Sequence, residues 1–293
     1  NVGASVGTKL SINGVVDGTN LSTVDLNGNG GFELTEATEL NLNNTKLTGN
    51  DTALINVANT GAVVNLKNSI LDGNITSTGA YNLNIKGSDT LTTINGTVSN
   101  ATATLTDATL KFNEDTFANA SLNATSGAIA LQDGAITDYL IKELTTASDV
   151  KYSIDVAMGN TVTADTIAVG STSTGTIYID KIGYGALQYP ADEFKVQVLK
   201  SENDNIKLTL NSDITDHHYD LGERTSRDEF DTVTAETSAS RIYYRYVRGG
   251  DLYGTIRLAT TNTADGFKPA ARHLISRNFS APRSAPKPAS VIQ

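Results

Sequence analysis

Several residue types are missing or scarce in this chain. Its 293 residues include no Cys, no Trp, one Met and five Pro. Without Cys, the chain can form no disulfide framework, no thiolate zinc site and no Cys nucleophile. No uninterrupted apolar run approaches the roughly 18 residues that a membrane-spanning helix needs. Residues 1–140 also lack Arg, His and Pro, so a triad that uses His would have to form later in the chain.

The charge balance is acidic, with 22 Lys and Arg against 32 Asp and Glu, which gives a formal net charge of −10. Such a balance argues against a protein that binds the phosphate backbone of nucleic acids. Hydrophobic residues make up 39 % of the chain, which is enough to bury a core. The chain begins at Asn1 with no initiator Met and no basic and apolar leader. We therefore expect a processed or excised piece whose export signal was removed.

Short runs of alternating apolar and polar residues fill the first 140 positions. A period of two predicts strands with one buried face. Gly and Asn residues follow each run, and they suit turns in which a residue takes a positive φ. The predicted strands cover residues 40–43, 64–67, 83–86, 103–106 and 129–132.

A degenerate repeat runs through these strands. Residues 41–50 and 65–74 are identical at six of ten positions, with an offset of 24. The shared pattern, Leu-x-Asn/Asp-x-x-Leu/Ile, returns at residues 105–110 and 131–136. It is imperfect at Ile85, whose second apolar residue, Leu91, comes one place late. The apolar anchors, spaced 21 residues apart on average, are Leu26, Leu42, Leu66, Ile85, Leu105 and Leu131.

A loose period near 20 with strand-turn-strand units predicts a parallel β-solenoid. Each coil would bury its Leu and Ile side chains and stack about 4.8 Å above the last. The Asn or Asp at each bend would bond the local backbone and stack as a polar ladder on successive coils. A β-sandwich of short strands is the alternative that the alternation leaves open.

The composition changes in the second half of the chain. All nine Arg lie after position 220, and all three His are late. Residues 137–144 predict a short helix or a lateral loop that interrupts the coils. Further strands are predicted at residues 152–156, 176–179, 194–199 and 206–210, and a hairpin at residues 241–258 that turns at Gly249, Gly250 and Asp251.

We therefore expect an all-β chain with three parts. Residues 1–140 form solenoid coils, and residues 141–260 form later coils and a C-terminal hairpin cap. The cap is needed because both ends of a solenoid expose unpaired strands. Residues 261–293 hold four of the five Pro and a basic excess, which predicts a tail or linker that is disordered or extended.

Two stretches resemble a known family. The repeat style of residues 103–110, and the succession of residues 164–170, 175–179, 189–190 and 194–199, resemble coils of autotransporter passenger domains. These are pertactin-like right-handed parallel β-helices of Gram-negative bacteria. The resemblance covers about residues 25–260 and lacks the membrane β-barrel. It implies export across the outer membrane, display at the cell surface, and roles in adhesion, autoaggregation or surface coating. Any membrane contact would be made only through a translocator barrel outside this chain.

The residues offer little support for catalysis or metal binding. No Gly-x-Ser-x-Gly elbow is present, since Thr172 takes the central place between Gly170 and Gly175. Residues 213–220 are the one local cluster of metal-ligand types, but the adjacent His217 and His218 would point to opposite faces of a strand. We therefore predict no catalytic residue, no cofactor and no metal site. The mixed Tyr and Arg residues at 243–248 are interpreted as part of the capping hairpin, with nucleic-acid or glycan stacking as the alternative.

The leading hypothesis is a secreted, non-enzymatic β-solenoid at the surface of a Gram-negative cell. It would act as an adhesin, a self-associating protein or a structural surface protein, with other copies or with glycans and proteins of host or neighbouring cells as partners. The rival is a carbohydrate-active enzyme, a polysaccharide lyase or glycosidase, on the same solenoid. That rival needs a cleft with several carboxylates and a cation, but the early acids are scattered at Asp72, Asp89, Asp107 and Asp133. An inert stem for an active head is a third option.

Overall fold

In the computed structural model, the described residues are 2–3, 8–26, 30–58, 60–158, 162–184, 193–201, 205–211, 229–230, 239–247 and 253–260. Their regular structure consists of β-strands, with no helix among them. Residues 1–262 form one unit by their internal contacts, and residues 263–293 form a second one. The expected tail at 261–293 lies outside the described residues, and the division of the solenoid at residue 140 stays a prediction.

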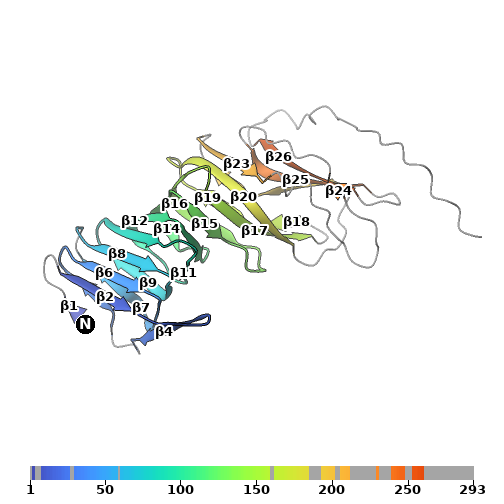
Figure 1. The fold of residues 1–293 in the computed structure, drawn as a ribbon. Helices are drawn as coiled ribbons and strands as arrows, with labels where there is room; N and C mark the ends of the chain where they lie inside the picture. Colours follow the sequence, from blue (N-terminus) through green and yellow to red (C-terminus); the bar gives the residue numbers. More distant parts are fainter. Residues whose placement is uncertain are drawn as a thin grey trace, which may run out of the picture. The chain divides into compact units, whose positions relative to one another are not determined.

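The chain winds repeatedly through stacks of parallel strands (Figure 1). The strands of the first stack are β2 (Lys9–Asn13), β6 (Glu39–Asn43), β8 (Val63–Lys67), β10 (Tyr81–Lys86), β12 (Ser99–Thr106), β14 (Phe117–Ala124) and β16 (Asp138–Thr146). Each of them pairs in parallel with the next, one coil further along the chain.

The second stack alternates with the first along the sequence as far as β17, and continues beyond it. Its strands are β4 (Asn20–Asp25), β7 (Thr45–Val57), β9 (Ile70–Ser77), β11 (Leu91–Ile94), β13 (Ala108–Phe112), β15 (Gly127–Ala130), β17 (Lys151–Met158), β20 (Thr174–Tyr184) and β23 (Ile206–Leu210).

A third set of parallel pairings completes the coils. At one end it joins β1 (Val2–Gly3) and β5 (Phe32–Leu34) to the second halves of β7 and β9. At the other it joins the first half of β16 to β19 (Thr166–Val169) and β22 (Leu199–Ser201). The short strands β3 (Val16–Asp17) and β18 (Val162–Ala164) pair antiparallel with β4 and β17. These parallel ladders are those of a β-solenoid, so the β-sandwich alternative is wrong.

The register confirms the central part of the repeat. Leu42 pairs with Leu66 at the predicted offset of 24, Leu66 with Ile85, and Ile85 with Leu105. The two outer anchors were wrong. Leu42 pairs backward with Ile12 rather than Leu26, and Leu105 pairs forward with Ala124 rather than Leu131. Coil length varies because the turns between strands absorb insertions.

The Asn or Asp of the repeat forms the bend between the first and second stacks. Asn44, Asn68 and Asp107 have φ values of 52°, 46° and 55°, a left-handed conformation that Asn and Asp tolerate better than other side chains. In the imperfect repeat Asp89 has a φ of 55°. The assignment of Leu91 as the second buried residue of that repeat was wrong, because Leu91 is 49 % exposed. Its coil is longer there, and the buried residue in register with Leu71 is Ile94.

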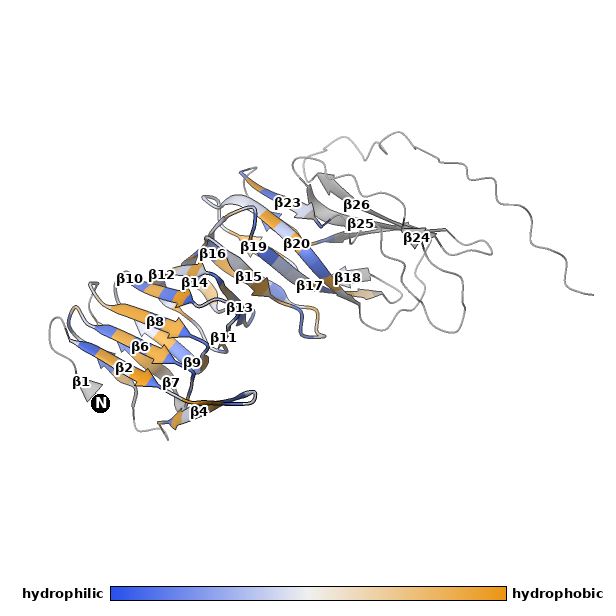
Figure 2. Ribbon diagram, in the orientation of Figure 1, coloured by the Kyte–Doolittle hydropathy of each residue, from blue (hydrophilic) through white to orange (hydrophobic). Residues whose placement is uncertain are grey.

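The core is a column of inward side chains from successive coils. Figure 2 shows the alternation of hydrophobic and hydrophilic residues along the strands of the first stack. The fully buried members on that stack include Leu40, Leu42, Val64, Leu66, Leu83, Ile85, Ala103 and Leu105. Burying one Leu or Ile side chain stabilises the fold by about 1.5–3 kcal/mol. Further along, the Phe112 ring meets the edges of Phe117 and Tyr139 with centroids 5.0 and 5.6 Å apart.

The prediction of a helix or lateral loop at residues 137–144 was wrong, because this segment forms strand β16. Its burial follows a period of two: Tyr139 and Ile141 are buried, whereas Leu140 and Lys142 are exposed. Parallel neighbours on both sides, β14 and β19, fix the segment as a strand. Local propensity yields to this pairing because tertiary contacts decide short elements.

The C-terminal hairpin is confirmed. Strands β25 (Ala239–Val247) and β26 (Tyr253–Thr260) pair antiparallel, and the expected turn at residues 249–251 lies outside the described residues. Strands β21 (Glu193–Gln197) and β24 (Glu229–Phe230) complete a separate four-stranded sheet. Strand β25 lies against β22 and β23, the last coil of the solenoid. The predicted strand at residues 194–199 is interrupted at Val198, which separates β21 from β22.

Candidate functional site

The outward face of the first stack carries one polar residue per coil at its centre. The parallel register places these residues in a single line, named here the central polar column, which consists of Ser11, Asn41, Asn65, Asn84, Thr104, Asn123 and Thr145. Each alternates along its strand with residues that point into the core, so the same period of two that builds the core also builds this column.

Hydrogen bonds join the side chains of the first coils in this column. Asn84 donates from Nδ2 to Asn65 Oδ1 at 2.8 Å, and Asn65 donates to Asn41 Oδ1 at 2.8 Å. Asn41 donates in turn to Ser11 Oγ at 3.3 Å. Asn41 and Asn65 are only 8 % and 6 % exposed. The amides are therefore held in one orientation, and every donor points toward the coil nearer the N-terminus.

Two flanking columns lie on either side of the central one. One flanking column consists of Lys9, Glu39, Val63, Asn82, Thr102, Ser121 and Glu143. The other consists of Asn13, Asn43, Lys67, Lys86, Thr106 and Thr125. Lys9 and Glu39 form an ion pair at 3.0 Å, and hydrogen bonding to Lys9 lowers the pKa of the Glu39 carboxyl. Together the three columns make a face of amides, hydroxyls and several charged side chains, which we call the polar face.

A second polar ladder follows the bend, as the repeat predicts. Asn68 donates to Asn44 Oδ1 at 2.9 Å, and both residues are bend residues of the repeat. Two coils further on, Ser126 Oγ donates to Asp107 Oδ1 at 2.7 Å. The expectation of stacked Asn and Asp side chains at the bends is thereby confirmed for Asn44 and Asn68, whereas Asp107 meets a Ser on the next coil.

A buried pair of carboxylates lies elsewhere in the solenoid, and sequence reasoning missed it. Asp155 on β17 is 5 % exposed, and Asp165, between β18 and β19, is fully buried. Burial raises the pKa of the Asp165 carboxyl to about 7, and the negative charges of Asp155 and Asp133 add to the rise, while hydrogen bonds from backbone N–H groups oppose it. Asp165 was read only as part of a strand motif, and nothing in its immediate sequence marks it as buried.

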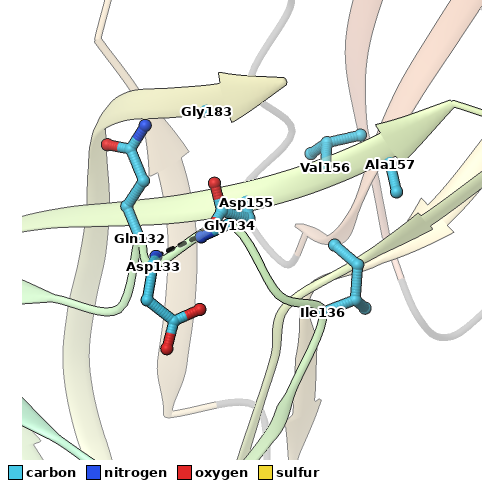
Figure 3. Close-up of a pocket in the computed structure, with 8 residues that line it drawn as sticks. All are labelled: Gln132, Asp133, Gly134, Ile136, Asp155, Val156, Ala157 and Gly183. Carbon is cyan, nitrogen blue, oxygen red and sulfur yellow. Dashed lines mark hydrogen bonds between the residues drawn. The ribbon is translucent and has the colours of Figure 1, made fainter. Parts of the chain in front are cut away.

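A pocket of about 440 Å³ adjoins this pair (Figure 3). Its lining residues are Gln132, Asp133, Gly134, Ile136, Asp155, Val156, Ala157 and Gly183. Asp155 is turned toward the backbone of Asp133 and Gly134, from which it accepts hydrogen bonds. The lining offers two carboxylates and no Lys or Arg, whereas a lyase site needs a cationic or basic partner for its acids.

The other candidate residues play structural roles or are not described. Ser173, in the stretch that lacks a nucleophile elbow, is buried and accepts the N–H of Leu144 on its Oγ at 2.9 Å. Residues 213–220, with His217 and His218, lie outside the described residues. In the part of the chain that the structure describes, no three His, Asp or Glu side chains gather to hold a metal ion. Those same described residues include no helix long and apolar enough to cross a membrane.

Neither a protein-family model nor a curated protein sequence matches the chain. A solved structure, however, shares its fold. That structure is the Hap adhesin of Haemophilus influenzae. The two superpose with a TM-score of 0.51 at 16 % sequence identity, over 87 % of this chain and 24 % of the Hap chain. The likeness to the Hap adhesin confirms the expected kind of fold, and the chain spans about a quarter of that adhesin's length.

Proposed function

We propose that this chain is a non-enzymatic passenger domain, displayed at the surface of a Gram-negative cell, that acts as an adhesin by associating with further copies of itself. The observation that carries the proposal is the polar face, whose central column is regular over seven coils. The fold shared with the Hap adhesin supports the adhesin part of this proposal.

The spacing of the columns suits repeated weak bonds. Coils about 4.8 Å apart present amide and hydroxyl groups at a constant interval. Each hydrogen bond between two copies contributes only about 0.5–1.5 kcal/mol net. A rigid array forms many such bonds at once through its more exposed side chains, such as Asn82, Asn84 and Thr102. The buried part of the ladder holds the coils in register, so that little further entropy is lost on binding.

The nature of the face favours a protein partner of the same kind over a sugar. Carbohydrate sites commonly stack sugar rings on exposed aromatic side chains. In the described residues whose burial is known, every aromatic side chain is buried or only partly exposed, among them Phe32, Tyr81, Phe112, Phe117, Tyr139, Tyr152 and Tyr178. The pocket beside Asp155 lacks the cation that a carbohydrate-active enzyme would need there, so the rival function has less support.

The test places charge on the polar face without touching the core. Asn82→Lys and Thr102→Lys, combined in one variant, change exposed neighbours on β10 and β12 that are in register. The added Lys side chains on two copies would repel each other where their polar faces meet. The variant should therefore show no self-association in sedimentation experiments or cell-aggregation assays. The control is Thr23→Lys, an exposed position on β4 of the second stack, which should associate as wild type does.

Circular dichroism should show that all three proteins are folded. A wild-type chain that stays monomeric and does not aggregate cells contradicts the self-association proposal. So does a loss of association in the Thr23→Lys control that equals the loss in the double variant, because the polar face would then have no special part.

A further inference from the structure

A short polar row on the outer side of the second stack ends at a glycine. The parallel register places Asp155 of β17 opposite Gly183 of β20, and Gln132 follows β15 on the preceding coil. A Cβ atom at position 183 would collide with Asp155 Oδ1 and with Gln132 Nε2. Only a glycine therefore leaves room for both head groups, which form one side of the pocket in Figure 3.

Asp155 presents one unbonded oxygen to this pocket, although the residue is only 5 % exposed. Its Oδ2 accepts the N–H groups of Asp133 and Gly134 at 2.7 and 2.6 Å. Two donors on one oxygen suit a carboxylate. Within the described residues, no hydrogen bond reaches Oδ1. Nor is Oδ1 one of the enclosed polar atoms, so it faces the open space of the pocket.

Two exposed residues of the lining add further acceptor oxygens. Asp133 Oδ1 accepts the N–H of Ala135 at 2.9 Å, which leaves its Oδ2 available. The Gln132 amide has no hydrogen bond in the part of the chain that the structure describes. The pocket therefore offers three oxygens from three different side chains, rather than the two oxygens of one carboxylate.

The chain supplies no cation to these acids within its described residues. The lining contains Asp133 and Asp155 but neither Lys nor Arg. Lys181, two residues before Gly183 on β20, is exposed and does not line the pocket. The ion pairs found among the described residues leave out both acids. A buried carboxylate without a cation is costly, and a ligand that brings a positive charge would reduce that cost.

The remaining side chains of the lining are apolar. They belong to Ile136, Val156 and Ala157, and Ile136 is 39 % exposed. The pocket volume of about 440 Å³ lies in the range of sites for small ligands. Apolar side chains beside a negative end suit a ligand with a cationic head and a hydrocarbon stem, because the stem can be buried while the head meets the carboxylates.

We propose that this pocket binds an alkylammonium group, which a lysine side chain of another protein and a free aliphatic amine both carry. The ammonium donates to Asp155 Oδ1, Asp133 and Gln132 accept its other N–H groups, and the hydrocarbon stem lies against Ile136. Three separate donors match three single oxygens, whereas a guanidinium binds best to both oxygens of one carboxylate. This site does not depend on the self-association proposed above.

An NMR titration of the full chain with n-butylammonium chloride, at constant ionic strength, tests the site. The backbone amide signals of Asp133, Gly134, Asp155 and Gly183 should shift and saturate, whereas those of β8 should not. n-Butanol has a similar stem without the charge and should bind at least about tenfold more weakly. n-Butylguanidinium should also bind more weakly than the ammonium. The proposal is overturned if the ammonium shifts none of the four signals, or if n-butanol or n-butylguanidinium binds as tightly.

Variants locate the binding on the pocket. Asp133→Asn should weaken the binding of n-butylammonium by about two- to fivefold. The control, Asp149→Asn, changes the net charge equally at an exposed acid in the turn between β16 and β17, and should bind as wild type does. Gly183→Ala should abolish binding, because the added Cβ displaces the Asp155 and Gln132 head groups. If that variant does not fold, Asp133→Asn, at an exposed position, remains the test. Equal affinities of the two Asn variants would contradict the site.

A peptide distinguishes the two sources of the group. The probe is a pentapeptide with blocked ends, a central Lys and four Ala residues, titrated in the same way as n-butylammonium. A peptide that binds at least as tightly as the free amine identifies a lysine side chain of a protein as the ligand. Binding of the free amine alone identifies a small amine. Binding of neither overturns the proposal.

Discussion

Asn65 donates its side-chain amide to the side-chain oxygen of Asn41 at 2.8 Å, across 24 residues of sequence. It also donates to Glu39 Oε1 at 3.0 Å and accepts from Asn84 at 2.8 Å. One buried amide thus connects three successive coils. In a solenoid, such a side-chain hydrogen bond between successive coils stabilises the stack, provided that both partners are present.

Asn65→Ala should therefore destabilise the solenoid. The substitution leaves the Asn84 donor and the Asn41 acceptor without partners on a nearly buried line, which costs about 1–3 kcal/mol. Urea unfolding followed by circular dichroism measures this change. Asn82→Ala, exposed on the same face, should change the free energy of unfolding by less than about 0.5 kcal/mol. If the two substitutions lowered the free energy of unfolding equally, the ladder would make no contribution to stability.

The bend between the first two stacks can be tested at Asn68. This residue has a φ of 46°, where a β-branched side chain is strained. Asn68→Val should cost about 1–3 kcal/mol through that strain and the lost bond to Asn44. Asn68→Gly accepts the conformation and should retain most of the stability. Comparing the two thermal unfolding midpoints separates strain from hydrogen bonding, and a Gly variant as unstable as the Val variant would exclude strain as the cause.

In the imperfect repeat that begins at Ile85, the residue that points into the core can be tested directly. Ile94 is fully buried and Leu91 is 49 % exposed. Ile94→Ala should cost about 2–5 kcal/mol through lost burial and the cavity left behind. Leu91→Ala removes as much side chain but should cost less than about 1 kcal/mol. Denaturant midpoints of the two variants would reverse their order if Leu91, as the bare repeat suggests, pointed into the core.

The global stability of the chain should depend on pH through Asp165. Its raised pKa of about 7 means that the folded chain binds a proton that the unfolded chain has released above about 3.8. The free energy of unfolding should therefore decrease as the pH rises from 5.5 to 7, by at most about 1.4 kcal/mol per unit from this group. Glu39 and Asp138, whose pKa values are lowered, are ionised throughout this window and do not contribute. Urea unfolding at several pH values measures the slope, and Asp165→Asn should flatten it.

Much of the fold was readable from the sequence because a solenoid is locally encoded. The pairing of Leu42 with Leu66 and the bend at Asn68 follow from one short pattern repeated at a nearly constant interval. Errors arose where the interval changed. Leu131 has the right neighbours for an anchor, but it follows β15 in the second stack, since the pattern contains nothing that tells one stack from another.

The candidate sites were predictable to different degrees. The ladders were expected as a class, because identical side chains in register must meet. Their bonding partners depend on register, which fixes that Asn84 faces Asn65 and then Thr104. The Asp155–Asp165 pair could not be predicted, because its carboxylates bind N–H groups of residues 133, 134 and 137, which no periodic pattern links to them.

Asn41, Asn65 and Asn84 of the central polar column all donate in one direction along the stack. Their amide dipoles therefore add, and the first four coils of this face have an electrical polarity that runs with the chain. Side-by-side dipoles attract when they are opposed and repel when they are aligned. Two molecules meeting through this face would consequently be biased toward running in opposite directions, as molecules anchored on two facing cells do.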